Sequence, residues 1–161
     1  MKRTVLLGLL LALYTLPALG ADNITGRARA IDGDTMKVGG VEIRLFGVDA
    51  PELKQTCTTK KGKVQRCGDL ARQMLNTLTM NVKVKCRPQG LDKDGAIVAI
   101  CFSGPFDINE QMVSSGWALP LPEETEAYIR ARKFASARSE GMWRGTFIPP
   151  QQWRQENGME E

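Results

Sequence analysis

The chain has 161 residues, a quarter of them charged, and its formal net charge at pH 7 is +4. This length predicts one ordinary domain, and so small a net charge does not by itself indicate nucleic-acid binding. The sequence contains no histidine. Imidazole metal ligands and imidazole general bases are therefore excluded, and acid–base chemistry must be done by carboxylates, lysine, tyrosine or cysteine.

Residues 1–20 have the pattern of a signal peptide. Lys2 and Arg3 form a basic start, an apolar run extends from Val5 to Leu16, and small residues end at Gly20. The run is too short to span a bilayer, so we expect a periplasmic or secreted protein without stable membrane association. An N-terminal membrane anchor is the alternative. If residues 1–20 are a signal peptide, the domain covers residues 21–148 and is followed by a poorly ordered tail over residues 149–161.

Alternation of apolar and polar residues predicts strands over residues 24–31, 35–38 and 41–46. Gly39-Gly40 suits a two-residue hairpin turn, which would pair Met36 with Ile43 and Val38 with Val41. Residues 53–68 are predicted to be a loop. This loop carries five positive charges and no acid, namely Lys54, Lys60, Lys61, Lys63 and Arg66. It either attracts a polyanion or is simply solvated, and the sequence does not decide between these.

The four cysteines favour one disulfide pairing. Strands over residues 82–86 and 96–101 flank a turn at residues 92–95, and this hairpin places Cys86 opposite Cys101. Cross-strand neighbours have nearly the separation that a disulfide requires. Cys57 and Cys67 are left for a second bridge, and two disulfides are typical of an oxidising compartment. Four free thiols are the alternative.

Periodicity predicts three helices, over residues 69–81, 107–115 and 123–140. Three strands, a helix, a strand hairpin and two further helices together predict a small closed β-barrel with helices packed on it.

Asp34, Arg44, Asp49 and Glu52 form a dense group of charges in the first half of the chain. Grouped carboxylates repel one another, and a hard cation such as Ca²⁺ removes that conflict, while the arginine can hold an anionic substrate. Strict alternation places Arg44 on the opposite face from Asp34, so the group requires Asp34 at the strand entrance or a nearby bulge. A turn with a surface ion-pair cluster is the alternative.

Three segments, taken in series, resemble the staphylococcal nuclease (thermonuclease) family. They are Ala-Ile-Asp-Gly-Asp-Thr over residues 30–35, Arg-Leu-Phe-Gly-Val-Asp-Ala-Pro-Glu over residues 44–52, and Asp-Lys-Asp-Gly over residues 92–95. The resemblance extends from about residue 24 to residue 143. It implies a five-stranded OB-fold barrel with three packed helices.

The resemblance also implies the chemistry. Ca²⁺ would be bound by the side chains of Asp34 and Asp49 and by the backbone carbonyl of Ala50. Glu52 would act as the general base, and Arg44 would hold the phosphate and stabilise the transition state. DNA or RNA would be the substrate of a monomeric enzyme, bound additionally by lysines of the basic loop and of the second hairpin: Lys54, Lys60, Lys61, Lys63 and Lys93.

The sequence departs from the family pattern in the second hairpin. Ala96 stands where the family has a second catalytic arginine, and Asp94 replaces a phosphate-contacting tyrosine. Leu119 and Leu121 stand where nucleotide-contacting tyrosines are usual. Loss of one preorganised donor lowers the rate by about 10²–10³-fold, so we expect a slow nuclease. The alternatives are a non-catalytic module that binds cations and polyanions, and a hydrolase of another phosphorylated or polyanionic substrate.

Overall fold

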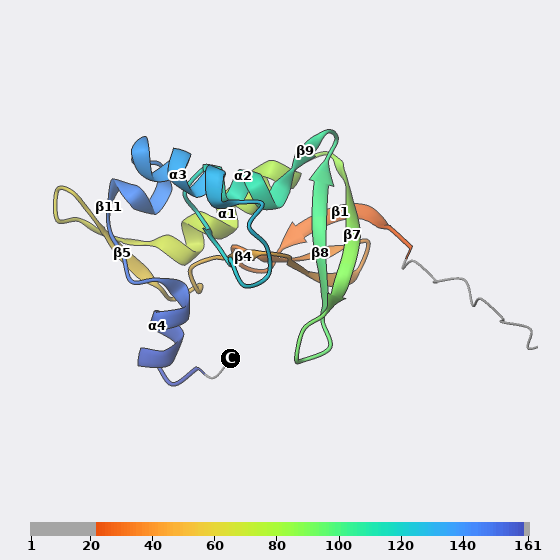
Figure 1. The fold of residues 1–161 in the computed structure, drawn as a ribbon, viewed down its shortest axis with the longest axis horizontal. Coiled ribbons are helices and arrows are strands. Elements are labelled where there is room, and N and C mark those ends of the chain that lie inside the picture. The colour runs from red at the N-terminus through yellow and green to blue at the C-terminus, as the bar shows by residue number, and fades with distance from the viewer. Residues whose placement is uncertain (1–21, 160–161) are drawn as a thin grey trace, which may run out of the picture.

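The computed structural model describes residues 22–159. Five strands form a closed barrel in the order β3-β2-β1-β7-β8, and the parallel pairing of β3 with β8 closes it (Figure 1). The predicted five-stranded barrel is confirmed. The strands are β1 (Ile24–Ala30), β2 (Thr35–Val38), β3 (Val41–Leu45), β7 (Lys83–Leu91) and β8 (Ile97–Ser103), with a short β9 (Phe106–Asp107) beside β8.

The β2–β3 hairpin has the predicted register. Met36 lies opposite Ile43, and Val38 lies opposite Val41. Met36, Val38 and Ile43 are completely buried, since alternate residues of each strand face the barrel interior. The predicted leader, residues 1–20, lies outside the described residues, so export remains a prediction. Within residues 22–159, no helix is long and apolar enough to cross a membrane.

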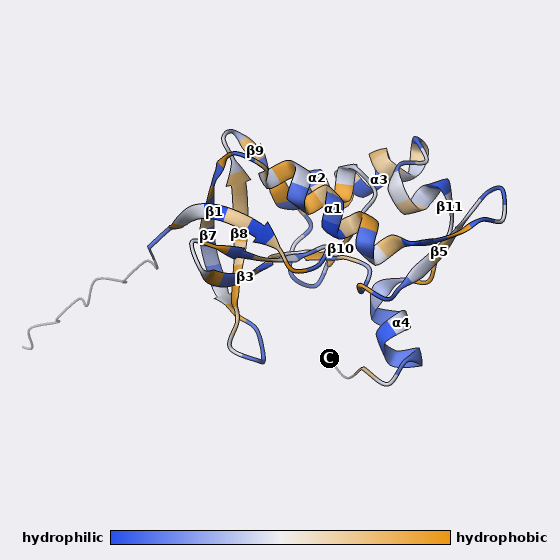
Figure 2. Cartoon of the chain, turned by 180° about the vertical axis from the view of Figure 1, so that it is seen from behind, coloured by the Kyte–Doolittle hydropathy of each residue, from blue (hydrophilic) through white to orange (hydrophobic). Residues whose placement is uncertain are grey.

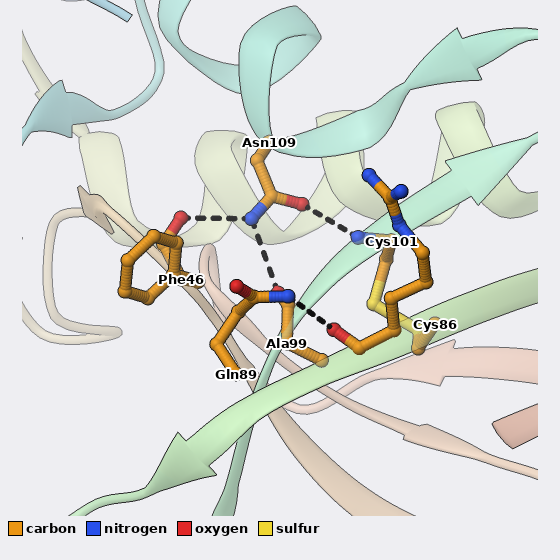
Figure 3. The surroundings of a disulfide bond; sticks show 7 residues. Phe46, Cys86, Gln89, Ala99, Cys101 and Asn109 are labelled. Carbon is orange, nitrogen blue, oxygen red and sulfur yellow. Dashed lines mark hydrogen bonds between the residues drawn. A yellow bond between two sulfur atoms is a disulfide. The ribbon is translucent and has the colours of Figure 1, made fainter. Parts of the chain in front are cut away.

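Both predicted disulfides are present, and the described part of the chain contains no free cysteine. Cys86 and Cys101 face each other across β7 and β8, as the hairpin register requires. Figure 3 shows the buried Asn109 beside this disulfide. Its amide accepts a hydrogen bond from the Cys101 backbone N–H (3.1 Å) and donates to the Phe46 carbonyl (2.8 Å). The disulfide and Asn109 together fix β8 against its neighbours.

Removal of the Cys86–Cys101 bridge is expected to lower the free energy of unfolding by about 3 kcal/mol, the loop-closure value for a loop of this size. The two cysteines are 15 residues apart and completely buried. Denaturant unfolding of Cys86→Ala/Cys101→Ala measures the loss. The Cys57→Ala/Cys67→Ala variant gives a comparison: its bridge closes a loop of 10 residues, so the same argument predicts a slightly smaller loss. An unchanged unfolding midpoint in the first variant would contradict the stabilising role.

The basic segment over residues 53–68 is not a loop, contrary to expectation. It forms a hairpin of β5 (Thr56–Thr59) and β6 (Val64–Arg66), and β5 also pairs with β11 (Gly145–Thr146). The threonines of β5 favour a strand, and the Cys57–Cys67 disulfide fixes the hairpin to the start of the following helix. The run of basic residues therefore lies at an exposed hairpin turn.

Residues 22–159 form four α-helices rather than the predicted three: α1 (Cys67–Thr79), α2 (Ile108–Ser114), α3 (Ile129–Ala137) and α4 (Pro150–Glu156), with a 3-10 turn at Gly141–Arg144. α1 and α2 agree with prediction. α3 begins later than expected, because the chain turns at Leu121, whose carbonyl accepts from the N–H groups of Glu124 and Thr125.

The last helix, α4, was not expected. The tail was predicted to be poorly ordered, yet Pro150 begins a helix there, where its fixed φ suits the first helical position and its side chain is buried. Figure 2 shows α4 as largely hydrophilic, so its sequence has no apolar stripe that could have predicted a helix.

Candidate active site

A cleft of about 530 Å³ opens where the barrel meets α4 and the turn between β7 and β8. These two elements project on the same side of the molecule (Figure 1). The cleft contains all four charged residues singled out in the first half of the sequence, and also Lys93. Its carboxylates are Asp32, Asp34, Asp49, Glu52, Asp92, Asp94, Glu123 and Glu124, and its cations are Arg44, Lys93 and Arg154.

Asp34 lies at the entrance to β2, one of the two arrangements that the sequence allowed. The Asp32 carboxylate accepts from the backbone N–H groups of Asp34 (3.0 Å) and Thr35 (2.7 Å), which forms the turn before the strand. The Asp34 carboxylate in turn accepts from the Ala50 N–H at 2.7 Å. A Cβ added to Gly33 would lie 2.6 Å from the Cβ of Ala50, so only glycine lets the turn before β2 come this close to Ala50. The turn before β2 therefore places the Asp34 carboxylate next to residues 49–52, so the turn itself brings the acidic residues together.

The surroundings of Asp34 favour a bound cation. Burial and the neighbouring Asp32 and Asp49 carboxylates raise the pKa of Asp34 well above its usual 3.8. A cation would offset this repulsion. Residues 22–159 contain no group of three or more His, Cys, Asp or Glu side chains placed to hold a metal ion. Two carboxylates and the carbonyl of Ala50, completed by water, nevertheless fit a hard cation that accepts oxygen ligands.

Asp49 and Glu52 are joined by an arginine that the sequence did not reveal. Asp49 ends β4 (Val48–Asp49), which pairs with β10 (Leu119–Pro120). Arg154 of α4 donates from the same nitrogen, Nη1, to Asp49 Oδ1 at 2.8 Å and to Glu52 Oε1 at 3.0 Å. More than 100 residues separate Arg154 from either acid. No local pattern could have predicted the contact.

The backbone of Glu52 is fixed on two sides. Gln55 is 1% exposed, and its side-chain oxygen accepts from the Glu52 N–H at 3.2 Å, while its own N–H donates to the Glu52 carbonyl at 2.7 Å. Gly68, at the start of α1, packs so closely that a Cβ there would overlap the Glu52 carbonyl oxygen. The side chain of Glu52 is 27% exposed and faces the cleft. Its position suits a base that must reach a solvent molecule.

Arg44 is held by Glu124, a partner that sequence reasoning missed. Arg44 Nη2 donates to Glu124 Oε1 at 2.6 Å, and the other oxygen of Glu124 accepts from the Gly47 N–H at 2.6 Å. Because this carboxylate contacts both groups, it ties the guanidinium to the backbone at Gly47. Arg44 Nε is buried and has no hydrogen-bond partner among the described residues. Arginine has five N–H donors, and the Arg44 side chain is 28% exposed, so an anion in the cleft would meet an exposed N–H of the guanidinium rather than Nε.

The turn between β7 and β8 is organised by Asp92, whose carboxylate accepts from the N–H groups of Asp94 (3.0 Å) and Ala96 (2.8 Å). Lys93 and Asp94 are exposed on the cleft rim, and Leu121 also lines the cleft. Four predicted substrate-binding lysines are exposed on or beside the β5–β6 hairpin and do not line the cleft: Lys54, Lys60, Lys61 and Lys63. Their contact with substrate remains a prediction.

Comparison with known proteins agrees with this geometry. Residues 42–145 match the family described as staphylococcal nuclease homologue. The succinoglycan biosynthesis protein ExoI of Rhizobium meliloti is 33% identical over 145 residues, which cover 88% of this chain and 76% of that protein. An uncharacterised endonuclease of Haemophilus influenzae is 29% identical, covering 96% of this chain and 87% of its own. One of Escherichia coli is 28% identical, covering 91% and 94%. With a matched segment of this extent, and with its barrel and acidic cleft, the chain belongs to the staphylococcal nuclease homologue family.

Proposed function

We propose that this protein is an exported nuclease that hydrolyses phosphodiester bonds of DNA or RNA with the aid of Ca²⁺. The observation that carries the proposal is the convergence of Asp34, Asp49, Glu52 and Arg44 on one cleft. The family membership and the two relatives named endonucleases support it. The two disulfides suit an oxidising compartment such as the periplasm, and we propose that the protein acts there as a monomer.

Each residue has a distinct task in this mechanism. Glu52 accepts a proton from the water that attacks phosphorus, and its anchored backbone keeps the carboxylate in reach of that water. Arg44, oriented by Glu124, donates from the exposed part of its guanidinium to a phosphoryl oxygen as negative charge develops there. Asp34, Asp49 and the Ala50 carbonyl would hold Ca²⁺, which when bound supplies Lewis-acid polarisation of the phosphate.

We propose that the rate is low. Ala96, beside the turn that forms the cleft rim, provides no positive charge, and Asp94 adds a negative one to an already acidic cleft. A non-catalytic module that binds cations and polyanions is the second candidate. Ala96 and Asp94 favour this binding module, and so does the relative that is named for succinoglycan biosynthesis rather than for nuclease activity. Hydrolysis of another phosphorylated substrate also stays open.

A cleavage assay with labelled DNA and RNA, in Ca²⁺ and then in EDTA, tests the proposal. We expect slow cleavage in Ca²⁺, none in EDTA, and recovery on adding Ca²⁺ back. Binding of the polymer without any cleavage would replace the nuclease with the second candidate.

The metal assignment predicts that Asp49→Asn lowers Ca²⁺ affinity at least about tenfold, roughly 1.4 kcal/mol, because one of two charged ligands is lost. Titration calorimetry measures the affinity. Glu123→Gln is the matched control, since it neutralises an exposed carboxylate that lines the same cleft. Equal affinities in the wild type and in Asp49→Asn would refute the assignment.

A further inference from the structure

Arg154 reaches the centre of the cleft from the far end of the chain. Its guanidinium bridges Asp49 and Glu52, and its side chain is only 17% exposed. Resting on the function proposed above, we propose that Arg154 is a second phosphate-binding guanidinium of this site. In this role it donates to the phosphoryl oxygens of a bound phosphodiester together with Arg44.

Gln55 contacts both the segment that leads into α4, the helix that carries Arg154, and the backbone of Glu52, the proposed base. The side-chain nitrogen of Gln55 donates to the Ile148 carbonyl at 2.7 Å, just before α4, while its side-chain oxygen accepts from Glu52 N–H. Pro150, the first residue of α4, is buried. One buried amide thus links the entry to α4 with the backbone of Glu52, which places α4 against the cleft.

The Arg154 guanidinium lies between Asp49 and Glu52, which is where the proposed reaction requires the phosphate. A phosphorus under attack must lie within reach both of the cation-binding carboxylate of Asp49 and of the base Glu52. Arg154 Nη1 lies within 3.0 Å of an oxygen of each. A substrate phosphate in that place therefore meets this guanidinium directly. The planar fork of arginine suits phosphate oxygens better than a lysine ammonium does.

The charge of the cleft gives a second reason. Eight carboxylates and three cationic side chains line it, so an entering phosphodiester meets an excess of negative charge. Of the three cations, Lys93 is exposed at the rim, whereas Arg44 and Arg154 are each paired with carboxylates of the cleft. Arg154 is the cation beside Asp49 and Glu52, where the phosphoryl group must gain negative charge.

Arg154 shares Asp49 with any cation that binds there. Removing the guanidinium therefore leaves Ca²⁺ affinity unchanged or raises it, while weakening the hold on a phosphodiester. If Arg154 only supported Asp49, its removal would weaken the binding of both Ca²⁺ and the phosphodiester. A fall in phosphodiester binding alone therefore identifies Arg154 as a phosphate ligand.

The experiment compares the wild type, Arg154→Gln, Arg154→Lys and Arg138→Gln. Arg138 is an exposed arginine that pairs with Glu140 outside the cleft, so its variant is the control. Calorimetry gives Ca²⁺ affinity, and fluorescence anisotropy in Ca²⁺ gives the affinity for a labelled thymidine octanucleotide with phosphorothioate linkages, which keep the charge and hydrolyse slowly. Cleavage rates on ordinary DNA complete the comparison.

We expect Arg154→Gln to bind the oligonucleotide about tenfold more weakly and to cleave DNA about 10²–10³-fold more slowly, with Ca²⁺ affinity equal or higher. Arg154→Lys should recover part of the binding, and Arg138→Gln should match the wild type. Unchanged oligonucleotide binding, or faster cleavage, in Arg154→Gln would overturn the proposal, and so would a parallel fall in Ca²⁺ affinity. A wild type that binds the oligonucleotide through Arg154 without cleaving DNA would refute the nuclease and keep this assignment. A wild type that does neither would refute both.

Discussion

Replacement of Glu52 by glutamine is expected to lower Ca²⁺-dependent cleavage by about 10²–10⁴-fold, the usual contribution of a general base. Glutamine keeps the shape of the side chain and can still accept a hydrogen bond from Arg154, but it cannot take a proton from water at neutral pH. Initial rates of DNA cleavage at saturating Ca²⁺ measure the effect.

Two controls make this result interpretable. Glu123→Gln removes an equal charge from an exposed side chain of the same cleft, so its rate should stay close to that of the wild type. The thermal midpoint of Glu52→Gln should also stay near that of the wild type, because the Gln55 contacts that fix residue 52 involve only its backbone. Cleavage by Glu52→Gln at the wild-type rate would remove Glu52 from the chemistry.

The second large effect concerns Arg44. Arg44→Gln is expected to lower the cleavage rate by about 10²–10³-fold, roughly 3–4 kcal/mol of transition-state stabilisation, because a preorganised donor is lost. Arg44→Lys should be intermediate, since an ammonium keeps the charge but not the fork that contacts both Glu124 and a phosphate. The measurement is kcat and KM with a short labelled DNA.

The changes in kcat and KM of Arg44→Gln show whether Arg44 acts on the transition state or only binds substrate. If Arg44 acts on the transition state, kcat falls more than KM rises. Arg29→Gln is the control, because Arg29 is an exposed arginine of β1 outside the cleft. A change in KM alone would show that Arg44 binds substrate without assisting the reaction.

The barrel was predictable because its signals are local. The two-residue period fixed the register of Met36 with Ile43, and the same reasoning placed Cys86 opposite Cys101. The position of Asp34 at the strand entrance was one of two arrangements that alternation allowed. In each case the partners lie in one hairpin, or in the turn beside it.

The other half of the site depends on contacts that no local pattern contains. Glu124 was assigned to a long helix, but it lies in a turn and its carboxylate contacts Arg44 and Gly47. Arg154 lies on a short hydrophilic helix whose docking depends on the buried amide of Gln55. Periodicity measures apolar burial, so it cannot detect a helix whose contacts with the rest of the fold include an amide hydrogen bond and ion pairs.

From the sequence separation of these contacts we expect a particular order of assembly. The ion pairs of the cleft join residues 80, 102 and 105 positions apart. The barrel consists of three hairpins between neighbouring strands, together with the pairings of β1 with β7 and of β3 with β8, which join segments closer in sequence than any of these ion pairs. Because distant segments meet after local ones, the cleft is completed late in folding. By the same reasoning it opens first under mild denaturation, so a molecule can keep its barrel after α4 has detached.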